Sequence, residues 1–374
     1  MALVDEAFDI HAFSFPGRPP ATLNIPTVIP FDLALAPANP LHSAPGRRTL
    51  RFRRLLEAVK FGKAFDWLTP ALRKTVARVQ PDIIHTFGLE PAGALIAAMR
   101  GSDVSFSKPR WVAQLRGGSD LELRKFDADE MRAAVKILQS ADVIVSDNLR
   151  NFRYLADAGI DPKHFASISP VPGSGGIDLE AIAASTDPAS GRRVILWPKA
   201  YNTPYMQALP ILEALRMAWP RLQPCRLVVL WATQSEVRDW IRAVCSELAV
   251  SWDVRDRVGR DEVFTLLRQS RVMLAPSLVD GVPNMLYEAM ATGVLPIVSP
   301  LGTISDVVKD RENVLFARNL HPQEIADALI EAMDDDALVD RIAETNRARV
   351  YELADRAQIR LKVRAFYSQI YGSK

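Results

Sequence analysis

Cysteine is scarce in this chain of 374 residues, which contains only Cys225 and Cys245. Two cysteines without ligand-like spacing provide neither a disulfide framework nor a structural zinc site, and they favour a reducing compartment. The five histidines form no metal-binding or triad-like group. No apolar run approaches the roughly 18 residues that a membrane-spanning helix needs, and the N-terminus lacks the charged start and apolar stretch of a signal peptide. These absences predict a cytoplasmic protein with no bound metal.

An excess of charge of one sign is also missing. The formal net charge is +2, which gives no global preference for nucleic acid. Apolar residues make up 48% of the chain and charged residues 24%, which is ordinary for a globular protein. The length is sufficient for two domains with full hydrophobic cores.

Strand-like apolar runs alternate with helical segments in two series, the pattern of parallel α/β sheets. The first series has predicted strands at Phe8–Phe15, Asp82–Phe87, Trp111–Leu115, Val143–Ser146 and Ala166–Ser169, and helices at Ala92–Arg100 and Asp129–Gln139. The second has strands at Val194–Trp197, Leu227–Trp231, Val272–Ala275, Leu295–Val298 and Val314–Phe316, and helices at Tyr205–Trp219, Ser235–Leu248 and Glu262–Gln269. Between them, residues 170–192 are rich in Pro, Gly and Ser and are predicted to connect two domains. Residues 336–371 are predicted to be largely helical.

The most informative stretch is DGVPNMLYEAMATGVLPIV, residues 280–298. Asp280 precedes a predicted helix, and Glu288 follows eight positions later. Pro283 suits the first helical position, where its missing N–H needs no partner. The open N–H groups and the dipole of a helix start favour a bound anion. With a carboxylate one turn deeper, the stretch predicts a site for a phosphate and a polyol together.

This stretch resembles the donor-site signature of the retaining nucleotide-sugar glycosyltransferases of family 4, the group 1 type. That signature has two glutamates separated by seven residues, commonly with Gly, Pro and Asn between them. Here Asp280 replaces the first glutamate. The resemblance implies an α/β chain with the GT-B fold, in which two Rossmann-like domains face each other across a cleft.

The resemblance also implies a division of the chain. We expect an N-terminal acceptor domain over residues 1–175, a nucleotide-sugar donor domain over residues 193–350, and a helix over residues 351–374 that crosses back to the N-terminal domain. Family members usually open with a strand, a Gly-rich loop and a helix before the segment that resembles residues 6–17. The first βα unit and its loop are therefore expected to be missing.

Several residues of the stretch would bind the donor if the resemblance holds. Glu288 would accept hydrogen bonds from two ribose hydroxyls, because a carboxylate is an acceptor only and has two oxygens; the alternative is a solvated helix glutamate. Asp280 would approach the transferred sugar, or act as the N-cap of the helix, or both. The main-chain amides that would meet the phosphate and sugar belong to Gly281, Val282, Pro283 and Asn284.

Lys199 is the candidate for the donor diphosphate. It lies in VILWPKAYNTPY, where relatives have a strand followed by Gly-Arg and then Lys-Gly. Lysine replaces the charge of that arginine but not its bidentate geometry; a surface lysine is the alternative. The second cation is absent, since Pro204 and Tyr205 lie near its position, and Arg260 is a candidate to replace it. Val258 and Arg260 also resemble the loop that meets the nucleobase.

The N-terminal half contributes a second candidate loop, QLRGGSDLEL, residues 114–123. It resembles a loop that often reads His-Gly-Ser-Asp, with Arg116 where histidine is frequent and Gly118 as an insertion. Arginine cannot act as a base there, but it can stabilise departing phosphate charge. Gly117, Gly118 and Ser119 would form a loop at the sugar or acceptor. The alternative is a βα turn capped by Ser119 or Asp120.

A basic run covers residues 47–63, with Glu57 as its one acid. Its partly amphipathic pattern predicts contact with an anionic membrane surface through Arg47, Arg48, Arg51, Arg53 and Arg54. A solvated helix with snorkelling side chains is an equal alternative. Nucleic acid is disfavoured because no aromatic stacking platform accompanies the charge.

The resemblance implies a retaining transferase that moves a hexosyl group from a nucleoside diphosphate sugar to a hydroxyl acceptor, which is a glycan, a lipid-linked acceptor or a small molecule. We expect no cofactor and no metal. The expected location is the cytoplasm, including the inner face of the membrane. The rival prediction is a catalytically degenerate homologue that binds sugar nucleotide or glycan. It is motivated by Asp280, the absent second cation and the absent N-terminal loop.

Overall fold

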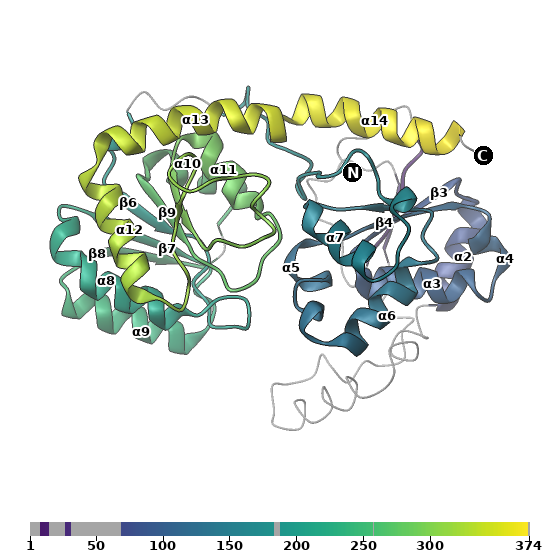
Figure 1. Cartoon of the computed structure of the whole chain (residues 1–374), viewed down its shortest axis with the longest axis horizontal. Helices are drawn as coiled ribbons and strands as arrows, with labels where there is room; N and C mark the ends of the chain where they lie inside the picture. Colours follow the sequence, from purple (N-terminus) through teal and green to yellow (C-terminus); the bar gives the residue numbers. More distant parts are fainter. Residues whose placement is uncertain (1–7, 15–26, 31–68, 183–187, 257, 373–374) are drawn as a thin grey trace.

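The computed structural model describes residues 8–14, 27–30, 69–182, 188–256 and 258–372. They form two α/β units beside one another, joined along one side by two long helices (Figure 1). The predicted membrane-contact arginines, in residues 47–63, lie outside this part of the chain.

The C-terminal unit is built on a parallel sheet of six strands in the order β11-β10-β9-β6-β7-β8. The strands are β6 (Val194–Trp197), β7 (Arg226–Leu230), β8 (Ser251–Arg255), β9 (Val272–Ala275), β10 (Leu295–Val298) and β11 (Leu315–Phe316). The order reverses between β6 and β9, which is the switch point where open α/β sheets bind ligands beyond the carboxyl ends of their strands. The predictions of β6, β9 and β10 are confirmed to the residue. β8 was not predicted, because this edge strand carries the exposed residues Ser251 and Trp252.

Helices cover both faces of this sheet: α8 (Ala208–Leu222), α9 (Ser235–Glu247), α10 (Arg260–Gln269), α11 (Asn284–Thr292) and α12 (Pro322–Asp334). The alternation of side chains along β6 separates the two layers. Ile195 and Trp197 pack in the cluster that includes α8, α9 and α12. Leu196 packs in the cluster that includes α10 and α11. Helix α11, which carries Glu288, thus shares a layer with α10.

The N-terminal unit contains a parallel sheet of β3 (Ile83–Phe87), β4 (Arg110–Gln114) and β5 (Val143–Val145), and a separate parallel pair, β1 (His11–Ser14) with β2 (Thr27–Pro30). Its helices are α2 (Thr69–Val79), α3 (Ala94–Arg100), α4 (Val104–Ser107), α5 (Gly117–Asp120), α6 (Ala128–Leu138) and α7 (Leu149–Asp157). Short turns of helix lie at η4 (Leu89–Gly93), η5 (Arg124–Phe126), η6 (Pro162–His164) and, at the end of the linker, η7 (Ala189–Gly191).

The predicted strand at Ala166–Ser169 is wrong. Only one bridge, between Ile144 and Phe165, marks its start. Further along, the Ser169 hydroxyl accepts a hydrogen bond from the Ser146 N–H at 3.0 Å. A side chain thus takes the place of the strand ladder, directly before Pro170, which has no N–H to donate.

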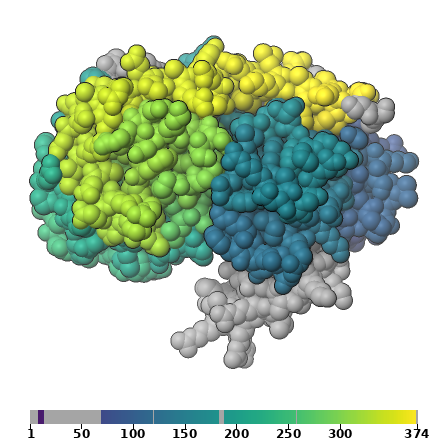
Figure 2. All heavy atoms as spheres, in the orientation of Figure 1, coloured from purple at the N-terminus to yellow at the C-terminus, as the bar shows by residue number. Residues whose placement is uncertain are grey.

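Two helices, α13 (Asp336–Ala354) and α14 (Arg356–Gly372), span both units and are separated by Asp355, whose backbone is extended. α13 packs against α11 in the C-terminal unit. α14 lies on the N-terminal unit (Figure 2), where Ile359 and Phe366 pack with Val112 of β4. Among the described residues, no helix is long and apolar enough to cross a membrane.

Candidate functional site

We call residues 280–298, the stretch that resembles the donor-site signature, the donor motif. It begins in the turn between β9 and α11, at the switch point of the sheet. Pro283 is the N-cap with an extended ψ of 133°, and α11 begins at Asn284. The expectation that Pro283 is the first helical residue is therefore wrong by one position. Asp280 does not cap α11 either. Its Oδ1 accepts a hydrogen bond from the Gly281 N–H at 2.9 Å, and its carbonyl accepts one from the Thr303 hydroxyl at 2.9 Å.

Lys199 follows β6 and lies on the other side of the switch point. Its Nζ is 3.2 Å from Asp280 Oδ2. Burial lowers the pKa of Lys199, but the charge of Asp280 and the hydroxyl of Tyr201 outweigh this effect and raise it overall. The sequence predicted both Lys199 and Asp280 as donor residues from segments 81 positions apart, and the structure brings them into one ion pair.

Glu288 lies in the second turn of α11, and its side chain is only 12% exposed. The alternative of a solvated glutamate is therefore wrong. Arg260 Nη2, at the start of α10, lies 3.8 Å from Glu288 Oε1. Burial raises the pKa of the Glu288 carboxyl, and the charge of Arg260 opposes this effect. Val258, just before α10, packs against the apolar cluster shared by α10 and α11.

Asn284 connects the start of α11 to the linker between the two units. Its exposed side chain accepts a hydrogen bond at Oδ1 from the Ser174 N–H at 3.0 Å. Gly173 lies beside it, because a Cβ added there would be 3.7 Å from the same oxygen. The amide of Asn284 thus helps to hold the linker next to the start of α11.

The two candidate loops meet directly, and we call this contact the domain seam. It consists of residues 116–120 and Asp147 from the N-terminal unit and residues 279–282 from the C-terminal unit. A Cβ added to Gly281 would lie 2.3 Å from Gly117 Cα. One added to Gly118 would lie 2.7 Å from Val279 Cγ1. Side chains at these glycines would push the loops apart, so the glycines permit a close contact between the two main chains.

Arg116 lies at the edge of the seam with an exposed side chain. Its backbone N–H donates to Asp120 Oδ2 at 2.6 Å, so Asp120 closes the turn as the alternative interpretation of this loop predicted. Burial raises the pKa of the Asp120 carboxyl, although hydrogen bonds from the Arg116 and Leu89 amides lower it. The guanidinium of Arg116 covers Gly88, where an added Cβ would lie 2.6 Å from Arg116 Nε.

Asp147 is a seam residue that the sequence analysis missed. It follows β5 in the triplet Ser146-Asp147-Asn148, and its Oδ2 accepts a hydrogen bond from the Val282 N–H at 3.3 Å. Burial raises the pKa of the Asp147 carboxyl to about 6; hydrogen bonds from Asn148 and Val282 lower it, and the charge of Asp280 raises it. A polar triplet at the carboxyl end of a predicted strand was the available signal. The Asp147 carboxylate thus already accepts a hydrogen bond from the Val282 amide, one of the amides that the donor phosphate is predicted to contact.

No group of three or more His, Cys, Asp or Glu side chains in the described ranges could hold a metal ion. The expectation of a reaction without a metal stays a prediction.

Residues 202–335 match the family model of the group 1 glycosyl transferases. The match covers the donor motif from β9 through α11 and supports a glycosyltransferase. An uncharacterised glycosyltransferase of Methanocaldococcus jannaschii is 25% identical over 146 residues, which span 38% of this chain and 37% of that relative.

Solved structures extend the similarity over most of the chain. Sucrose-phosphate synthase from Thermosynechococcus elongatus superposes with a TM-score of 0.71 at 18% identity, covering 93% of this chain and 84% of that one. Anabaena HepE in complex with UDP-glucose superposes with a TM-score of 0.64 at 15% identity, covering 87% and 90%. The expected GT-B fold is thus confirmed.

Proposed function

We propose that the protein is a retaining glycosyltransferase that moves a hexosyl group from a nucleoside diphosphate sugar to a hydroxyl acceptor. The observation that carries this proposal is the position of the donor motif. Its loop lies at the switch point, with Lys199 on one side and the buried Glu288 behind it. UDP-glucose bound to the structural neighbour HepE supports a nucleotide-sugar donor. The acceptor class, whether a glycan, a lipid-linked acceptor or a small molecule, is left to experiment.

The proposed roles follow from charge and geometry. Glu288 accepts hydrogen bonds from the ribose hydroxyls, and Lys199 exchanges its contact with Asp280 for the donor diphosphate. Asp280 then faces the transferred sugar. Arg116, at the opposite side of the seam, stabilises the negative charge that develops on the leaving diphosphate. The sequence offers no enzymic nucleophile, so we propose front-face attack, in which the departing phosphate takes the acceptor proton.

The amides of Gly281, Val282 and Asn284 complete the proposed phosphate site. The Val282 N–H already donates to a carboxylate, that of Asp147, so the loop accepts an anionic oxygen at this position. Donor binding would replace the Asp147 oxygen with a phosphate oxygen and would require a rearrangement of the seam. Val258 and Arg260 would contact the nucleobase side of the donor.

The test is a panel of nucleoside diphosphate sugars assayed for donor hydrolysis and for transfer to simple glycoside acceptors. Release of the nucleoside diphosphate, with an α-linked product from an α-linked donor observed by NMR, is the expected result. An inverted product would contradict the retaining mechanism. Tight donor binding without turnover would favour the degenerate binding homologue, for which the Lys199–Asp280 pair and the seam contact are the structural argument.

We also propose a cytoplasmic location, at the inner face of the membrane, through the basic residues 47–63. The measurement is co-sedimentation with anionic vesicles at low salt, where screening is weakest. Neutralising Arg51, Arg53 and Arg54 should reduce it, and unchanged sedimentation would contradict the membrane interpretation.

A further inference from the structure

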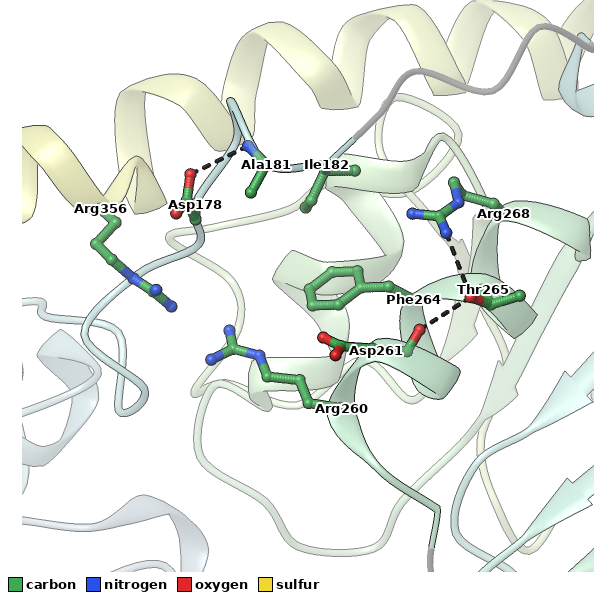
Figure 3. Close-up of a pocket in the computed structure, with 9 residues that line it drawn as sticks. All are labelled: Asp178, Ala181, Ile182, Arg260, Asp261, Phe264, Thr265, Arg268 and Arg356. Atoms are coloured by element: carbon green, nitrogen blue, oxygen red, sulfur yellow. Dashed lines mark hydrogen bonds between the residues drawn. The ribbon is translucent and has the colours of Figure 1, made fainter. Parts of the chain in front are cut away.

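A hollow of about 480 Å³ lies apart from the seam, beside the hinge, by which we mean the point where the linker at Ile177 pairs with the junction of α13 and α14. Five of its residues belong to α10, and the rest come from the linker, residues 170–192, and from the start of α14 (Figure 3). The lining residues are Asp178, Ala181, Ile182, Arg260, Asp261, Phe264, Thr265, Arg268 and Arg356. No residue of the candidate loops 116–120 or 279–283 lines it. Its volume is typical of a small-molecule site.

Among the lining residues of this hollow, which we call the hinge pocket, guanidinium groups outnumber carboxylates by one. Three guanidinium groups face two carboxylates, and the Asp178 carboxylate already accepts a hydrogen bond from the Ala181 N–H at 3.1 Å. Arg268 donates to the Thr265 hydroxyl at 3.3 Å. Within the described ranges neither Arg268 nor Arg356 forms an ion pair. Two of the three guanidinium groups of the pocket, those of Arg268 and Arg356, therefore have no ion-pair partner among the described residues.

Arg260 and Arg356 point toward one another across the pocket (Figure 3). Burial lowers the pKa of Arg356, the charge of Arg260 lowers it further, and Asp178 opposes both effects. The Arg356 side chain makes one neutral contact, donating to the Gly176 carbonyl at 3.2 Å. Two guanidinium groups that repel each other in a half-buried site are stabilised by an anion between them, and a phosphate matches their planar, multiply donating geometry.

We propose that the hinge pocket binds a phosphorylated small molecule, with its phosphate between Arg260 and Arg356 and its organic part along Phe264 toward Arg268. The ring of Phe264 and the side chain of Ile182 provide an apolar surface for that organic part. The ligand would contact α10, the end of the linker and the first residue of α14 at once. It would therefore bind where the chain passes twice between the two units.

The two passages of the chain are hydrogen-bonded to each other at this point. The Ile177 N–H donates to the Ala354 carbonyl at 2.7 Å, and the Arg356 N–H donates to the Ile177 carbonyl at 2.9 Å. Arg260 also connects the pocket to Glu288. Arg260 is also a proposed contact of the donor nucleobase, so the hinge pocket and the proposed donor site share this side chain. A phosphate that draws Arg260 away from Glu288 frees this carboxylate for ribose hydroxyls. This coupling, unlike the pocket itself, rests on the proposed function. Because of it, bound ribose 5-phosphate should raise the affinity of the protein for UDP, and bound UDP should raise its affinity for ribose 5-phosphate.

The binding test uses ribose 5-phosphate, inorganic phosphate and ribose in calorimetry on the full chain without nucleotide. Ribose 5-phosphate should bind, and ribose should not. If inorganic phosphate binds equally well, the ligand is free phosphate; if it binds more weakly, the ligand is a phosphate ester. Absence of binding by both phosphates would overturn the proposal.

Variants locate the bound phosphate. Arg356→Gln should weaken binding about ten-fold or more, whereas Arg356→Lys should retain part of the affinity. Arg268→Glu, on the outer part of α10, tests the pocket independently if the first variant fails to fold. Arg242→Gln is the matched control, because Arg242 lies on α9 and pairs with Asp239 at the surface. If both Arg356→Gln and Arg268→Glu bind ribose 5-phosphate with wild-type affinity, the phosphate does not bind in the hinge pocket and the proposal is wrong.

Competition separates this pocket from the donor site. UDP should leave ribose 5-phosphate bound and should raise its affinity; competitive displacement by UDP would show that the pocket is part of the donor site and would overturn the inference. A protein that binds ribose 5-phosphate but no UDP would contradict the proposed function and leave the hinge pocket standing.

Discussion

Two buried carboxylates, Glu288 and Asp147, lie in different domains near the turn between β9 and α11. Glu288 comes from the helix that follows this turn, and Asp147 from the strand end on the opposite side of the seam. Burial raises the pKa of both groups. Buried carboxylates are costly unless they are paired or hydrogen-bonded, and each of these has one partner that a ligand could exchange. They are therefore the side chains at which donor binding is best tested.

The substitution Glu288→Ala should weaken binding of a nucleoside diphosphate sugar. Two hydrogen bonds from ribose hydroxyls to a charged acceptor contribute about 1.5–3 kcal/mol each. Calorimetric titration of the donor measures the change, with Glu344→Ala on the exposed face of α13 as the control. An unchanged dissociation constant for Glu288→Ala would remove the ribose assignment.

The carboxyl of Asp147 should make folding less favourable as the pH rises. Its folded-state pKa of about 6 lies above the ordinary 3.8, so the folded protein holds this proton more tightly than the unfolded chain does. The stabilisation is complete below pH 4 and is lost as the pH rises to about 6, a loss of roughly 3 kcal/mol if the full shift applies. Asp147→Asn should remove this part of the pH dependence.

Urea unfolding at pH 4 and pH 7 measures the effect on both proteins. The free energy of unfolding of Asp147→Asn relative to that of wild type should be higher at pH 7 than at pH 4, because only wild type pays for the buried charge. Equal differences at the two pH values would show that Asp147 titrates normally.

At the scale of elements, the β9–α11 turn and the β4–α5 turn determine how closely the two domains approach. Each turn has a glycine at the point of contact, so the main chains of the two turns touch at Gly117 and Gly281. Both turns lie at the carboxyl ends of parallel strands. The sequence placed a candidate loop in each, and the sheet order places β9 beside β6 at the switch point.

The substitution Gly281→Ala should separate the domains. The new Cβ would lie 2.3 Å from Gly117 Cα and 2.4 Å from Asp147 Oδ2, distances that van der Waals contact forbids. We expect a larger radius of gyration in small-angle scattering and slower transfer from the donor. Gly191→Ala is the control, because its nearest neighbour is Pro188 Cγ at 3.7 Å. If Gly281→Ala has the same radius of gyration as Gly191→Ala and wild type, the glycine at position 281 is not needed for the close contact between the domains.

At the scale of the molecule, the end of the chain completes the N-terminal unit. Ile359, Phe366 and Ile370 of α14 lie in a cluster with Val112 and Val145 of the N-terminal sheet. Phe366 is 9% exposed, whereas Leu361 on the same helix is 66% exposed. The stability of the first half of the chain therefore depends on its last residues.

The substitution Phe366→Ala should destabilise the N-terminal unit by about 3 kcal/mol, since it removes a buried aromatic ring and leaves a cavity. Leu361→Ala should change stability by less than about 0.5 kcal/mol. Hydrogen exchange at β4 and β5 amides measures the local effect. If both variants exchange these amides at the wild-type rate, α14 does not stabilise this sheet.

The sequence was sufficient to predict an element or a motif when all of the residues that identify it lie in one continuous segment. The apolar runs of β6, β9 and β10 predict these strands to the residue because the strands are buried on both faces of a parallel sheet. The spacing from Asp280 to Glu288 likewise identifies the donor motif within one turn and one helix. The strand predicted at Ala166–Ser169 failed because a distant partner, Ser146, binds a side chain there instead of the backbone.

The amino-acid sequence by itself determined the α/β alternation, the donor motif and the residue types that the motif offers. Only the tertiary structure decided which of those residues meet. Lys199 pairs with Asp280, Asp147 reaches Val282, Arg260 lies beside Glu288, and Arg356 faces Arg260. The physical reason is that helix and strand periodicities arise from neighbours along the chain, whereas these contacts depend on sheet order, domain approach and the return of the last helix, which join residues far apart in sequence.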